Sequence, residues 1–503
     1  MSDTNEIRSV IVAGTGPEAW IIAGGLARAF ANRKLDVQVV DTGPSCSART
    51  GRWTLPSQRG MHALLGIPEP QFLLQTGATF KLATEFRGWQ GEDSRFLHAH
   101  GEIGVDIGGT PFYKFLQSEA IAGRAERPET FAIAGAAAAL GKFARPMGED
   151  RALSSRFTYA FHVDDARYTQ YLREHAAKLG VRAGSASLAR VELAEDGRID
   201  ALQLADGTRA VADFFIDCSG PEARLIGALP GSREDWSRWL PCDRMWSALA
   251  PARGEPRPVT EIRAQAAGWS WRAPLAQVSM VGLVFSSRHQ DESSALAALR
   301  EAEPALQGEP VLTRFSAGRR RQFWERNCVA IGGSAIELEP LAGADLHLAQ
   351  VGLANFIELF PRERGSTIES TEYSRVMAEY ADALRDFTLA HYHAGPVRSG
   401  EFWSALRAGP LPESLAQRLD LYAASGRLNM HDHEPFEEVD WAWLLIGSGC
   451  RPESLEQHVR LYLGRLSTQE VAALRQAIQQ LAASMPPHQE FLRRQAAMAA
   501  RTG

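Results

Sequence analysis

The sequence has little excess of either charge, few cysteines and no long hydrophobic run. Its 503 residues carry 54 basic and 60 acidic side chains, a net charge of −6, whereas nucleic-acid-binding proteins usually present a basic face. The alanine-rich run from Phe131 to Leu140 is too short to span a bilayer. Met1 to Glu6 lacks the apolar core of a signal peptide. We therefore expect a cytoplasmic protein without a nucleic-acid or membrane partner.

The cysteines and histidines exclude the common metal and disulfide frameworks. The five cysteines stand far apart, their number is odd, and no Cys-x-x-Cys pair occurs. Most are expected to be buried, reduced thiols. The histidines have no acidic partners at metal-ligand spacing, and His391-Tyr392-His393 is expected to lie in a helix, so no metal site is predicted. The residues concerned are Cys46, Cys218, Cys242, Cys328, Cys450, His162, His347, His391 and His393.

The chain opens with the pattern of a nucleotide-binding βαβ unit. Val10 to Ala13 and Val37 to Val40 are expected strands, and Trp20 to Phe30 between them has helical spacing. A G-x-G-x-x-A turn joins the first strand to the helix, where glycines admit a pyrophosphate and the helix N-terminus attracts it. The predicted cofactor contacts are Gly14, Gly16 and Ala19, with Asp41 after the second strand placed to bind an adenosine ribose.

Strand patterns in the middle of the chain give way to helical ones. Val191 to Phe215 alternates as strands do, with hairpin turns at Glu195-Asp196-Gly197 and Ala205-Asp206-Gly207. From Ser370 onward the pattern is largely helical. Glu413 to Ser425 and Ser454 to Leu466 are predicted helices, each with Pro-Glu-Ser near its start.

Trp269 and Trp271 point to the same side of an extended backbone, because side chains alternate along a strand. Pro274 is expected to end this strand. A pair of indoles suits the wall of a water-poor compartment, and a core strand filled with aromatics is the alternative.

The double-tryptophan strand is one of several motifs that occur in a fixed order between about Ser9 and Tyr462. The others are Gly77-Ala78-Thr79-Phe80-Lys81-Leu82, Tyr159-Ala160-Phe161-His162-Val163-Asp164, Asp217-Cys218-Ser219-Gly220, Trp239-Leu240-Pro241-Cys242-Asp243, Arg314-Phe315-Ser316-Ala317-Gly318-Arg319-Arg320 and Glu339-Pro340-Leu341. In this order the motifs resemble the flavin-dependent tryptophan halogenase family.

The resemblance implies an enzyme that uses FAD, reduced by a separate flavin reductase, with oxygen and chloride or bromide. Hypohalous acid would travel down a tunnel to a lysine, which forms a haloamine or holds the oxidant by a hydrogen bond. An electron-rich indole- or phenol-like ring then takes up the halogen. Lys81 matches this lysine by its place in the motif. Burial would favour its uncharged amine, and a surface lysine is the alternative.

The resemblance also assigns further site residues. Trp269 and Trp271 would wall the tunnel between flavin and substrate. Trp441 and Trp443 would border the substrate pocket, with helix packing as the alternative. Gly332 and Gly333 would lie near the pyrophosphate or isoalloxazine of FAD.

One departure from the family falls on the halide loop. The family's Glu-Pro-Leu-Glu-Ser-Thr-Gly is here Glu339-Pro340-Leu341-Ala342-Gly343-Ala344-Asp345. The second glutamate, which assists the lysine in the family, is Ala342, and the Thr-Gly pair linked to halide is Ala344-Asp345. Asp345 would repel a halide unless it turns away. Asp345 is also a candidate replacement for the missing glutamate, because a helical start would bring it near.

Two more departures fall on the cofactor contacts. The family's Gly-Glu-Ala-Thr strap is here Gly51-Arg52-Trp53-Thr54, so Arg52 would pair with a phosphate or Trp53 would occupy flavin space. The opening turn contains Pro17, which suits the first turn of a helix, and Glu18, which would repel a pyrophosphate unless it points away.

The sequence therefore predicts an α/β fold of the FAD-dependent monooxygenase type, with a Rossmann-type βαβ unit, mixed sheets and a helical C-terminal subdomain. Residues 1–400 would form the core and residues 401–503 the subdomain. The leading function is FAD-dependent halogenation of an aromatic compound. The alternatives are a non-halogenating flavin monooxygenase or oxidase, and a degenerate relative with weak or no FAD binding that acts as a partner protein. The oligomeric state stays open, with a homodimer as one alternative.

Overall fold

The chain folds into two compact units, each built from three segments. The computed structural model describes residues 6–43, 49–148, 152–396, 398–463 and 466–502. Unit 1 comprises Met1–Gly77, Val163–Ser247 and Glu309–Asp382; unit 2 comprises Ala78–His162, Ala248–Gly308 and Ala383–Gly503. The boundary predicted at residue 400 does not coincide with a unit boundary, because residues 401–503 fold with two earlier segments.

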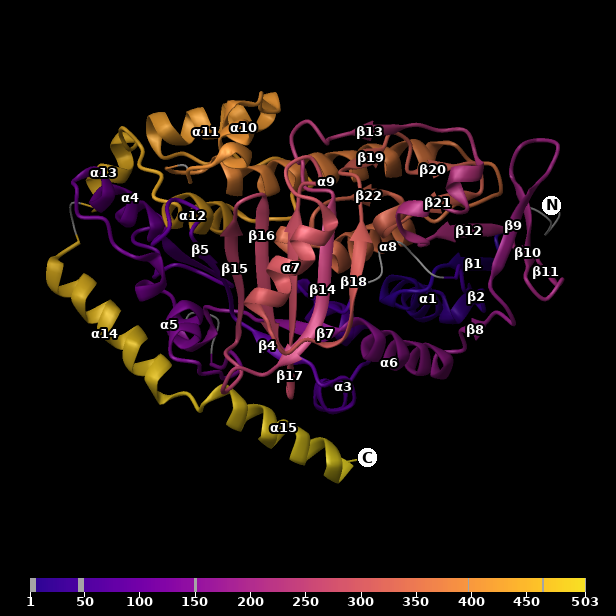
Figure 1. The fold of residues 1–503 in the computed structure, drawn as a ribbon, viewed down its shortest axis with the longest axis horizontal. Helices are drawn as coiled ribbons and strands as arrows, with labels where there is room; N and C mark the ends of the chain where they lie inside the picture. Colours follow the sequence, from indigo (N-terminus) through magenta and orange to yellow (C-terminus); the bar gives the residue numbers. More distant parts are fainter. Residues whose placement is uncertain (1–5, 44–48, 149–151, 397, 464–465, 503) are drawn as a thin grey trace. The chain divides into compact units, whose positions relative to one another are not determined.

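Unit 1 contains a six-stranded sheet with the order β20-β21-β12-β1-β2-β8. β1 pairs in parallel with β2 and with β12, and its residues Val10, Ile11 and Val12 are buried, as expected for a central parallel strand. Helix α1 packs against α6 and α8 (Figure 1). These elements are β1 (Ser9–Ala13), α1 (Pro17–Ala29), β2 (Asp36–Val40), α6 (Asp165–Lys178), β8 (Arg182–Ala183), β12 (Phe214–Asp217), β20 (Trp324–Glu325), β21 (Cys328–Ala330) and α8 (Asp345–Glu358).

Two small antiparallel sheets also belong to unit 1. Both predicted hairpin turns are confirmed, since Gly197 N donates to Ala194 O at 2.9 Å and Gly207 N to Leu204 O at 3.0 Å. The strands are β9 (Leu188–Leu193), β10 (Ile199–Leu204) and β11 (Arg209–Ala210) in one sheet, and β13 (Arg233–Asp235), β19 (Gly318–Arg320) and β22 (Ile336–Glu337) in the other. Unit 1 also holds β3 (Gly51–Trp53), α2 (Ser57–Leu65) and α3 (Glu69–Thr76).

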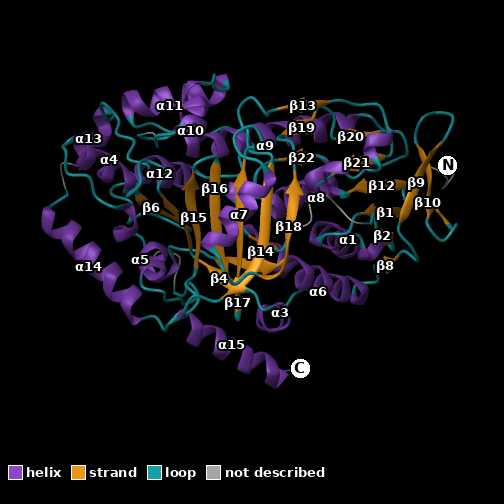
Figure 2. Cartoon of the chain, viewed as in Figure 1, coloured by secondary structure: helices purple, strands orange, loops and turns teal. Residues whose placement is uncertain are grey.

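Unit 2 contains a mixed sheet in which β17, β16, β15, β5 and β6 lie side by side (Figure 2). β15 pairs in parallel with β5, whereas the other neighbours are antiparallel. Trp269 and Trp271 are both buried on β16, and this strand ends at Pro274 as predicted. The strands of unit 2 are β4 (Thr79–Lys81), β5 (Ala83–Arg87), β6 (Arg95–Ala99), β15 (Val259–Gln265), β16 (Gly268–Pro274) and β17 (Val278–Phe285).

Helices dominate the C-terminal part of unit 2, as predicted. In Figure 1, α14 passes along α5, with which it is in contact. The helices are α4 (Tyr113–Ile121), α5 (Ile133–Ala139), α7 (Glu292–Ala302), α10 (Glu401–Ala408), α11 (Glu413–Ser425), α12 (Glu438–Gly447), α13 (Gln457–Leu463), α14 (Thr468–Ser484) and α15 (His488–Thr502). Four elements contain residues of both units: β7 (Ala160–Asp164), β14 (Arg244–Pro251), β18 (Gln307–Arg314) and α9 (Ile368–His393).

One helix start differs from its prediction. α11 begins at Glu413 as expected, but α13 begins at Gln457 rather than near Ser454. Ser454 Oγ donates to Ala424 O at 2.8 Å, and Glu453 N donates to Ala423 O at 2.7 Å. These bonds hold the second Pro-Glu-Ser segment against the end of α11, and the helix begins three residues after Ser454.

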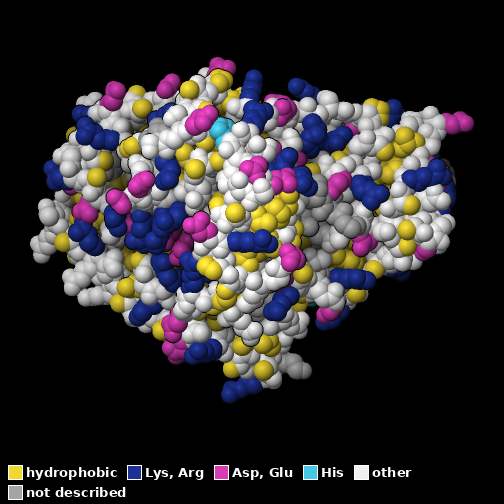
Figure 3. All heavy atoms as spheres, in the orientation of Figure 1, with side chains coloured by type: hydrophobic (Ala, Val, Ile, Leu, Met, Phe, Trp, Pro, Cys, Tyr) yellow, Lys and Arg dark blue, Asp and Glu magenta, His cyan; other side chains and the backbone are white. Residues whose placement is uncertain are grey.

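The state of the described cysteines and the mixture of charges on the surface agree with what the composition predicts. Cys218, Cys242 and Cys328 are buried free thiols and Cys450 is partly buried; Cys46 lies outside the described residues. Basic and acidic side chains are interspersed over the face shown in Figure 3. Within the described ranges, no helix is long and apolar enough to cross a membrane, and no group of three or more metal-ligating side chains occurs.

Candidate active site

A cavity of about 730 Å³ lies in unit 1, where the β1–α1 turn meets the ends of β2, β12 and β21. Six of the eight predicted cofactor contacts line it. They are Gly14, Gly16, Asp41, Arg52, Gly332 and Gly333. The other two, Ala19 and Trp53, are buried beside it, Ala19 in α1 and Trp53 in β3. The structure thus gathers residues from three distant parts of the sequence around one space.

The β1–α1 turn requires small residues. A Cβ atom on Gly14 would stand 2.6 Å from the carbonyl oxygen of Cys218, too close for any other side chain. Pro17 takes the first position of α1, where its missing N–H costs no hydrogen bond. The N-terminal end of α1 therefore opens on the cavity, with the partial positive charge of its free N–H groups.

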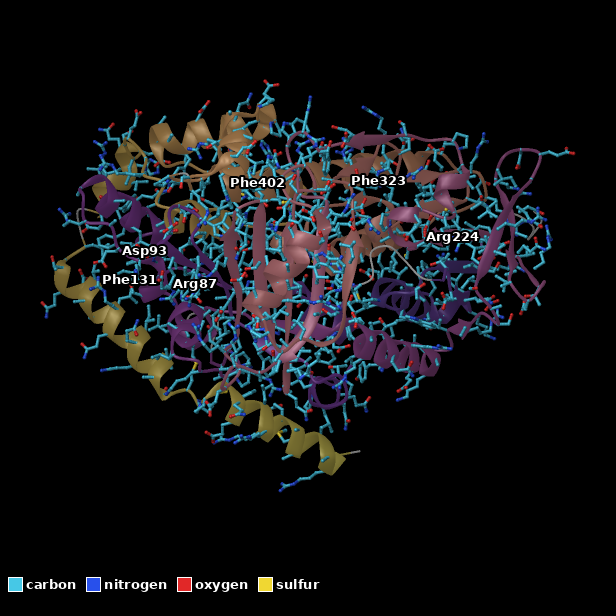
Figure 4. All side chains as sticks on the ribbon, viewed as in Figure 1. Arg87, Asp93, Phe131, Arg224, Phe323 and Phe402 are labelled. Atoms are coloured by element: carbon cyan, nitrogen blue, oxygen red, sulfur yellow. The ribbon has the colours of Figure 1, made fainter. Side chains whose placement is uncertain are left out.

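Asp41 follows β2 and lines the same cavity as the β1–α1 turn. Its carboxylate accepts hydrogen bonds from Gly43 N at 2.6 Å and from Thr15 Oγ1 at 3.1 Å. Arg224, labelled in Figure 4, donates to the carbonyl oxygens of Thr42 and Leu188, the latter at 3.1 Å. These bonds tie the loop after β2 to β9 and hold Asp41 at the rim of the cavity.

Arg52 forms ion pairs with two carboxylates. Its guanidinium donates to Glu18 of α1 and to Asp165 of α6, with an Nε–Oδ1 distance of 2.7 Å to Asp165. Burial lowers the pKa of Arg52, but the two carboxylates outweigh this effect and raise it well above its usual value, so Arg52 stays charged. Glu18, which would otherwise repel a pyrophosphate, is thereby neutralised by the arginine of the altered strap.

The remaining acidic groups of the cavity are also compensated. Asp345 begins α8 and accepts a hydrogen bond from Arg49 Nη1 at 2.7 Å, so the charge expected to repel a halide has a cationic partner. Burial raises the pKa of Glu337 to about 7, although Arg233 opposes the effect. The cavity therefore presents little uncompensated negative charge.

Two departures from the family motifs, in the strap and the halide loop, fit each other sterically. Gly343 has a φ of 65°, and a Cβ atom there would clash with the indole of Trp53. The bulky Trp53 therefore depends on the glycine that stands where the family has serine. Trp53 is only 3% exposed and packs against this loop.

These features fit FAD. A glycine turn at a helix N-terminus suits a pyrophosphate, an anchored Asp41 suits ribose hydroxyls, and Glu18, Asp165 and Asp345 are paired with arginines. Gly332 has a φ of 73°, and a Cβ atom on Gly333 would lie 3.2 Å from Gly220 Cα. Two glycine turns thus pack together at the wall of the cavity and leave space that side chains would fill.

Lys81 lies in unit 2 and is buried, with 2% of its surface exposed. It ends β4, where it pairs with Ala160 of β7. Phe80 points to the other face and stacks on Phe143 with a centroid distance of 4.0 Å. Thr79 Oγ1 donates to Pro274 O at 2.6 Å, which ties this segment to the end of the double-tryptophan strand. The predicted surface-lysine alternative is therefore wrong.

The amine of Lys81 contacts a histidine. Lys81 Nζ lies 3.0 Å from Nε2 of His100, which is itself buried. Burial lowers the pKa of Lys81 to about 7, although the carboxylate of Asp440 raises it. Burial, and then the charge of Lys81, lower the pKa of His100 well below its usual value. Lys81 is thus an amine that readily loses its proton near neutral pH.

Of the two tryptophans of α12, Trp443 contacts the residue after His100. Trp443 Nε1 donates to Gly101 O at 3.0 Å, and the Trp443 ring stacks on His98 with a centroid distance of 6.4 Å. The guanidinium carbon of Arg418 lies over the indole of Trp441, 4.3 Å from the centroid of that ring. Both indoles are fully buried.

Comparison with known proteins agrees with this geometry. The tryptophan halogenase family profile matches residues 9–462. The chain is 28% identical to tryptophan 7-halogenase KtzQ of Kutzneria sp. (strain 744), over 98% of this chain and 99% of KtzQ. The chain belongs to the tryptophan halogenase family. Two solved flavin-dependent halogenases superpose with a TM-score of 0.90. They are BrvH from Brevundimonas sp. BAL3, 34% identical over 97% of this chain and 99% of BrvH, and Xcc4156 from Xanthomonas campestris, 33% identical over 97% of this chain and 98% of Xcc4156.

This halogenase-family enzyme contains two residues near Lys81 that the sequence did not single out, His100 and Asp440. Their signals were present: His98 and His100 alternate along one face of an extended segment, and Asp440 precedes the Trp441 motif at a helix start. Asp345, predicted to assist Lys81, belongs to unit 1, where Arg49 is its partner.

Burial of Lys81 predicts a specific pH dependence of stability. Between about pH 7 and 10.5 the unfolded chain holds a proton on Lys81 that the folded enzyme lacks. The free energy of unfolding, relative to Lys81→Met, should therefore rise with pH by about 1.4 kcal/mol per unit in this window and stay flat below it. Urea unfolding at a series of pH values measures the difference. Lys178→Met, at an exposed lysine, should show no such slope; an equal slope in both comparisons would contradict the prediction.

Proposed function

We propose that this enzyme halogenates an electron-rich aromatic compound, indole- or phenol-like, with reduced FAD, oxygen and chloride or bromide. The observation that carries the proposal is the buried Lys81 amine, whose pKa lies near neutrality because of burial. The uncharged amine has the lone pair that a haloamine requires, and in either protonation state the buried group can hold hypohalous acid by donating a hydrogen bond. Family membership supports the same reaction.

The cavity of unit 1 would hold reduced FAD, which would activate oxygen, and oxygen supplies the oxidising equivalents for the halide. Gly14 and Gly16 would admit the pyrophosphate at the N-terminus of α1, Asp41 would accept hydrogen bonds from the ribose, and Gly332 and Gly333 would pass close to the cofactor. Arg52 keeps Glu18 from repelling the phosphates. Arg49 holds Asp345 at the start of α8, where the pair would border the halide path.

In unit 2 the tryptophans would separate and shape the compartments. Trp269 and Trp271 stand side by side on one face of β16 and exclude water by their bulk. Trp441 and Trp443 on α12 would border the aromatic substrate. We further propose a separate cytoplasmic flavin reductase as the partner, because the use of reduced FAD requires a source of electrons; family membership supports this.

Incubation with a flavin reductase, FAD and chloride or bromide, against a panel of indoles and phenols, tests the proposal. Halogenated product that depends on halide supports it. Hydroxylated product, favoured by the altered halide loop Ala342 to Asp345, would mean a flavin monooxygenase instead. A purified protein without affinity for FAD would mean a degenerate relative that acts with a partner.

Asp41→Ala should weaken FAD binding by at least about tenfold, because the variant loses charge-assisted hydrogen bonds to the ribose and the bonds that Asp41 accepts from Gly43 and Thr15. Titration of FAD followed by fluorescence quenching measures the affinity. Asp36→Ala removes an exposed carboxylate at the start of the same strand and should leave the affinity unchanged. Equal affinities of the wild type and Asp41→Ala would place FAD elsewhere.

A further inference from the structure

The amine of Lys81 has an unusual neighbour for a group that must lose its proton. The family's second glutamate is Ala342 in this chain, and the side chain within hydrogen-bond distance of Lys81 Nζ is the imidazole of His100, at 3.0 Å. A carboxylate at that distance would hold the lysine protonated, whereas a neutral imidazole offers a lone pair without a negative charge.

The backbone around His100 is fixed from several sides. His100 N donates to Leu82 O at 2.8 Å, and Thr158 N donates to His100 O at 3.2 Å. The next residue, Gly101, accepts the indole N–H of Trp443 at 3.0 Å. The bond to Leu82, the residue after Lys81, fixes the spacing between the two side chains. The contact between imidazole and amine is therefore built into the fold.

The polar groups around the pair have hydrogen-bond partners of their own, and the charge of Asp440 acts on Lys81. On β7, His162 bonds to Thr79 and to Thr260 at 3.0 and 2.9 Å, and burial lowers its pKa well below the usual value. On α12, Asp440 bonds to His98 at 3.2 Å and to Glu437 N at 2.9 Å. Asp440 is thus engaged elsewhere while its charge favours the ammonium of Lys81. Two cations in direct contact would repel, so the pair cannot hold both titratable protons.

The direction of the hydrogen bond follows from the donors available. An ammonium has no lone pair and can only donate, whereas an uncharged amine can still donate an N–H. An Nε2 of His100 without a hydrogen can therefore accept a hydrogen bond from Lys81 in both protonation states of the lysine. An Nε2–H could bond only to the uncharged amine, which has a lone pair. Acceptance in both states requires the tautomer of His100 that carries its proton on Nδ1.

We propose that His100 is a positioning residue for Lys81: its Nε2 accepts a hydrogen bond from the lysine amine, so that the buried pair holds one titratable proton. His100 would thereby take the place of the family's glutamate in controlling the lysine, without fixing it as a cation. This inference rests on the proposed function of Lys81 in halogen transfer, but its test needs no turnover.

NMR of the side chains tests the proposal in the full chain. The sequence contains only five lysines, Lys34, Lys81, Lys114, Lys142 and Lys178, so isotope-labelled lysine gives few signals, and Lys81→Met assigns the signal of Lys81. Loss of the acceptor in His100→Phe disfavours the ammonium, so the titration midpoint of Lys81 should fall by at least about 0.5 pH unit. His100→Gln keeps an acceptor oxygen and should restore most of the shift. His391→Phe makes the same change at another buried histidine of unit 2 and should leave the midpoint in place.

A midpoint of Lys81 that stays unchanged or rises in His100→Phe would overturn the proposal. Nitrogen spectra of labelled histidine in the wild type give a second test that needs no variant, in case His100→Phe does not fold. A bare Nε2 with a protonated Nδ1 on His100 supports the proposal, and a protonated Nε2 contradicts it. A wild-type enzyme that gives no halogenated product would refute the proposed function. Both NMR experiments would still test the contact between His100 and Lys81.

Discussion

Lys81→Met is expected to form halogenated product at least about 100-fold more slowly than the wild type. A loss of this size is usual when a group that transfers protons or holds a reactant is removed. Methionine keeps much of the buried volume of lysine and removes a desolvated amine, so the folded structure should persist. FAD affinity should not change, because the cavity of unit 1 does not include this residue. Product formation with bromide, measured by mass spectrometry at equal FAD occupancy, is the appropriate assay.

A second lysine provides the control for that experiment. Lys114 is also buried in unit 2, where it donates to Gly426 O at 2.7 Å. Lys114→Met removes the same amine, here one paired with Glu456 at 3.4 Å, and should retain product formation in the folded fraction. If Lys81→Met kept wild-type activity, or if both variants lost activity to the same degree, Lys81 would have no special part in the reaction.

Arg52→Met is expected to lower the free energy of unfolding by about 3–5 kcal/mol, because it leaves the carboxylates of Glu18 and Asp165 without their cation. The side chains of all three are largely buried, at 7%, 19% and 13% exposure. FAD affinity should fall as well, since an unpaired Glu18 at the N-terminus of α1 repels a pyrophosphate. Urea unfolding and FAD titration measure the two effects.

The matched control for Arg52 is an exposed ion pair in the same unit. Arg182 and Asp36 are 58% and 49% exposed, and Arg182→Met should change stability by less than about 1 kcal/mol. Adding Glu18→Gln and Asp165→Asn to Arg52→Met removes the unpaired charges and should recover a large part of both losses. Failure of this triple variant to recover either property would mean that Arg52 acts through packing rather than charge.

Local patterns were enough to predict the βαβ opening. β1, the glycine turn and α1 follow within about twenty residues, and each depends on neighbours in the sequence. The same holds for the hairpins of β9 to β11, the end of β16 at Pro274 and the helical C-terminal region. The later start of α13 was not predicted, and the segment before it bonds through Glu453 and Ser454 to the end of α11, a contact that the local pattern does not show.

Pairings between distant residues were not predictable from the sequence. For Arg52 a phosphate was one of the partners considered, and the fold adds Glu18 and Asp165, which lie 34 and 113 positions away. Trp53 and Gly343 looked like separate departures, and only the fold shows that one makes room for the other. His100 was missed because the alternation of His98 and His100 marks one face of a strand but does not show that Lys81, 19 positions earlier, lies against that face.

Lys81 can form a haloamine only if its buried amine loses its proton at neutral pH. The titration of the Lys81 side chain in the wild-type enzyme, followed by NMR with Lys81→Met to assign the signal, tests this directly. A midpoint near pH 7 is expected. A midpoint at about 10.4, the value of a solvated lysine, would contradict burial of the amine and with it the proposed reaction.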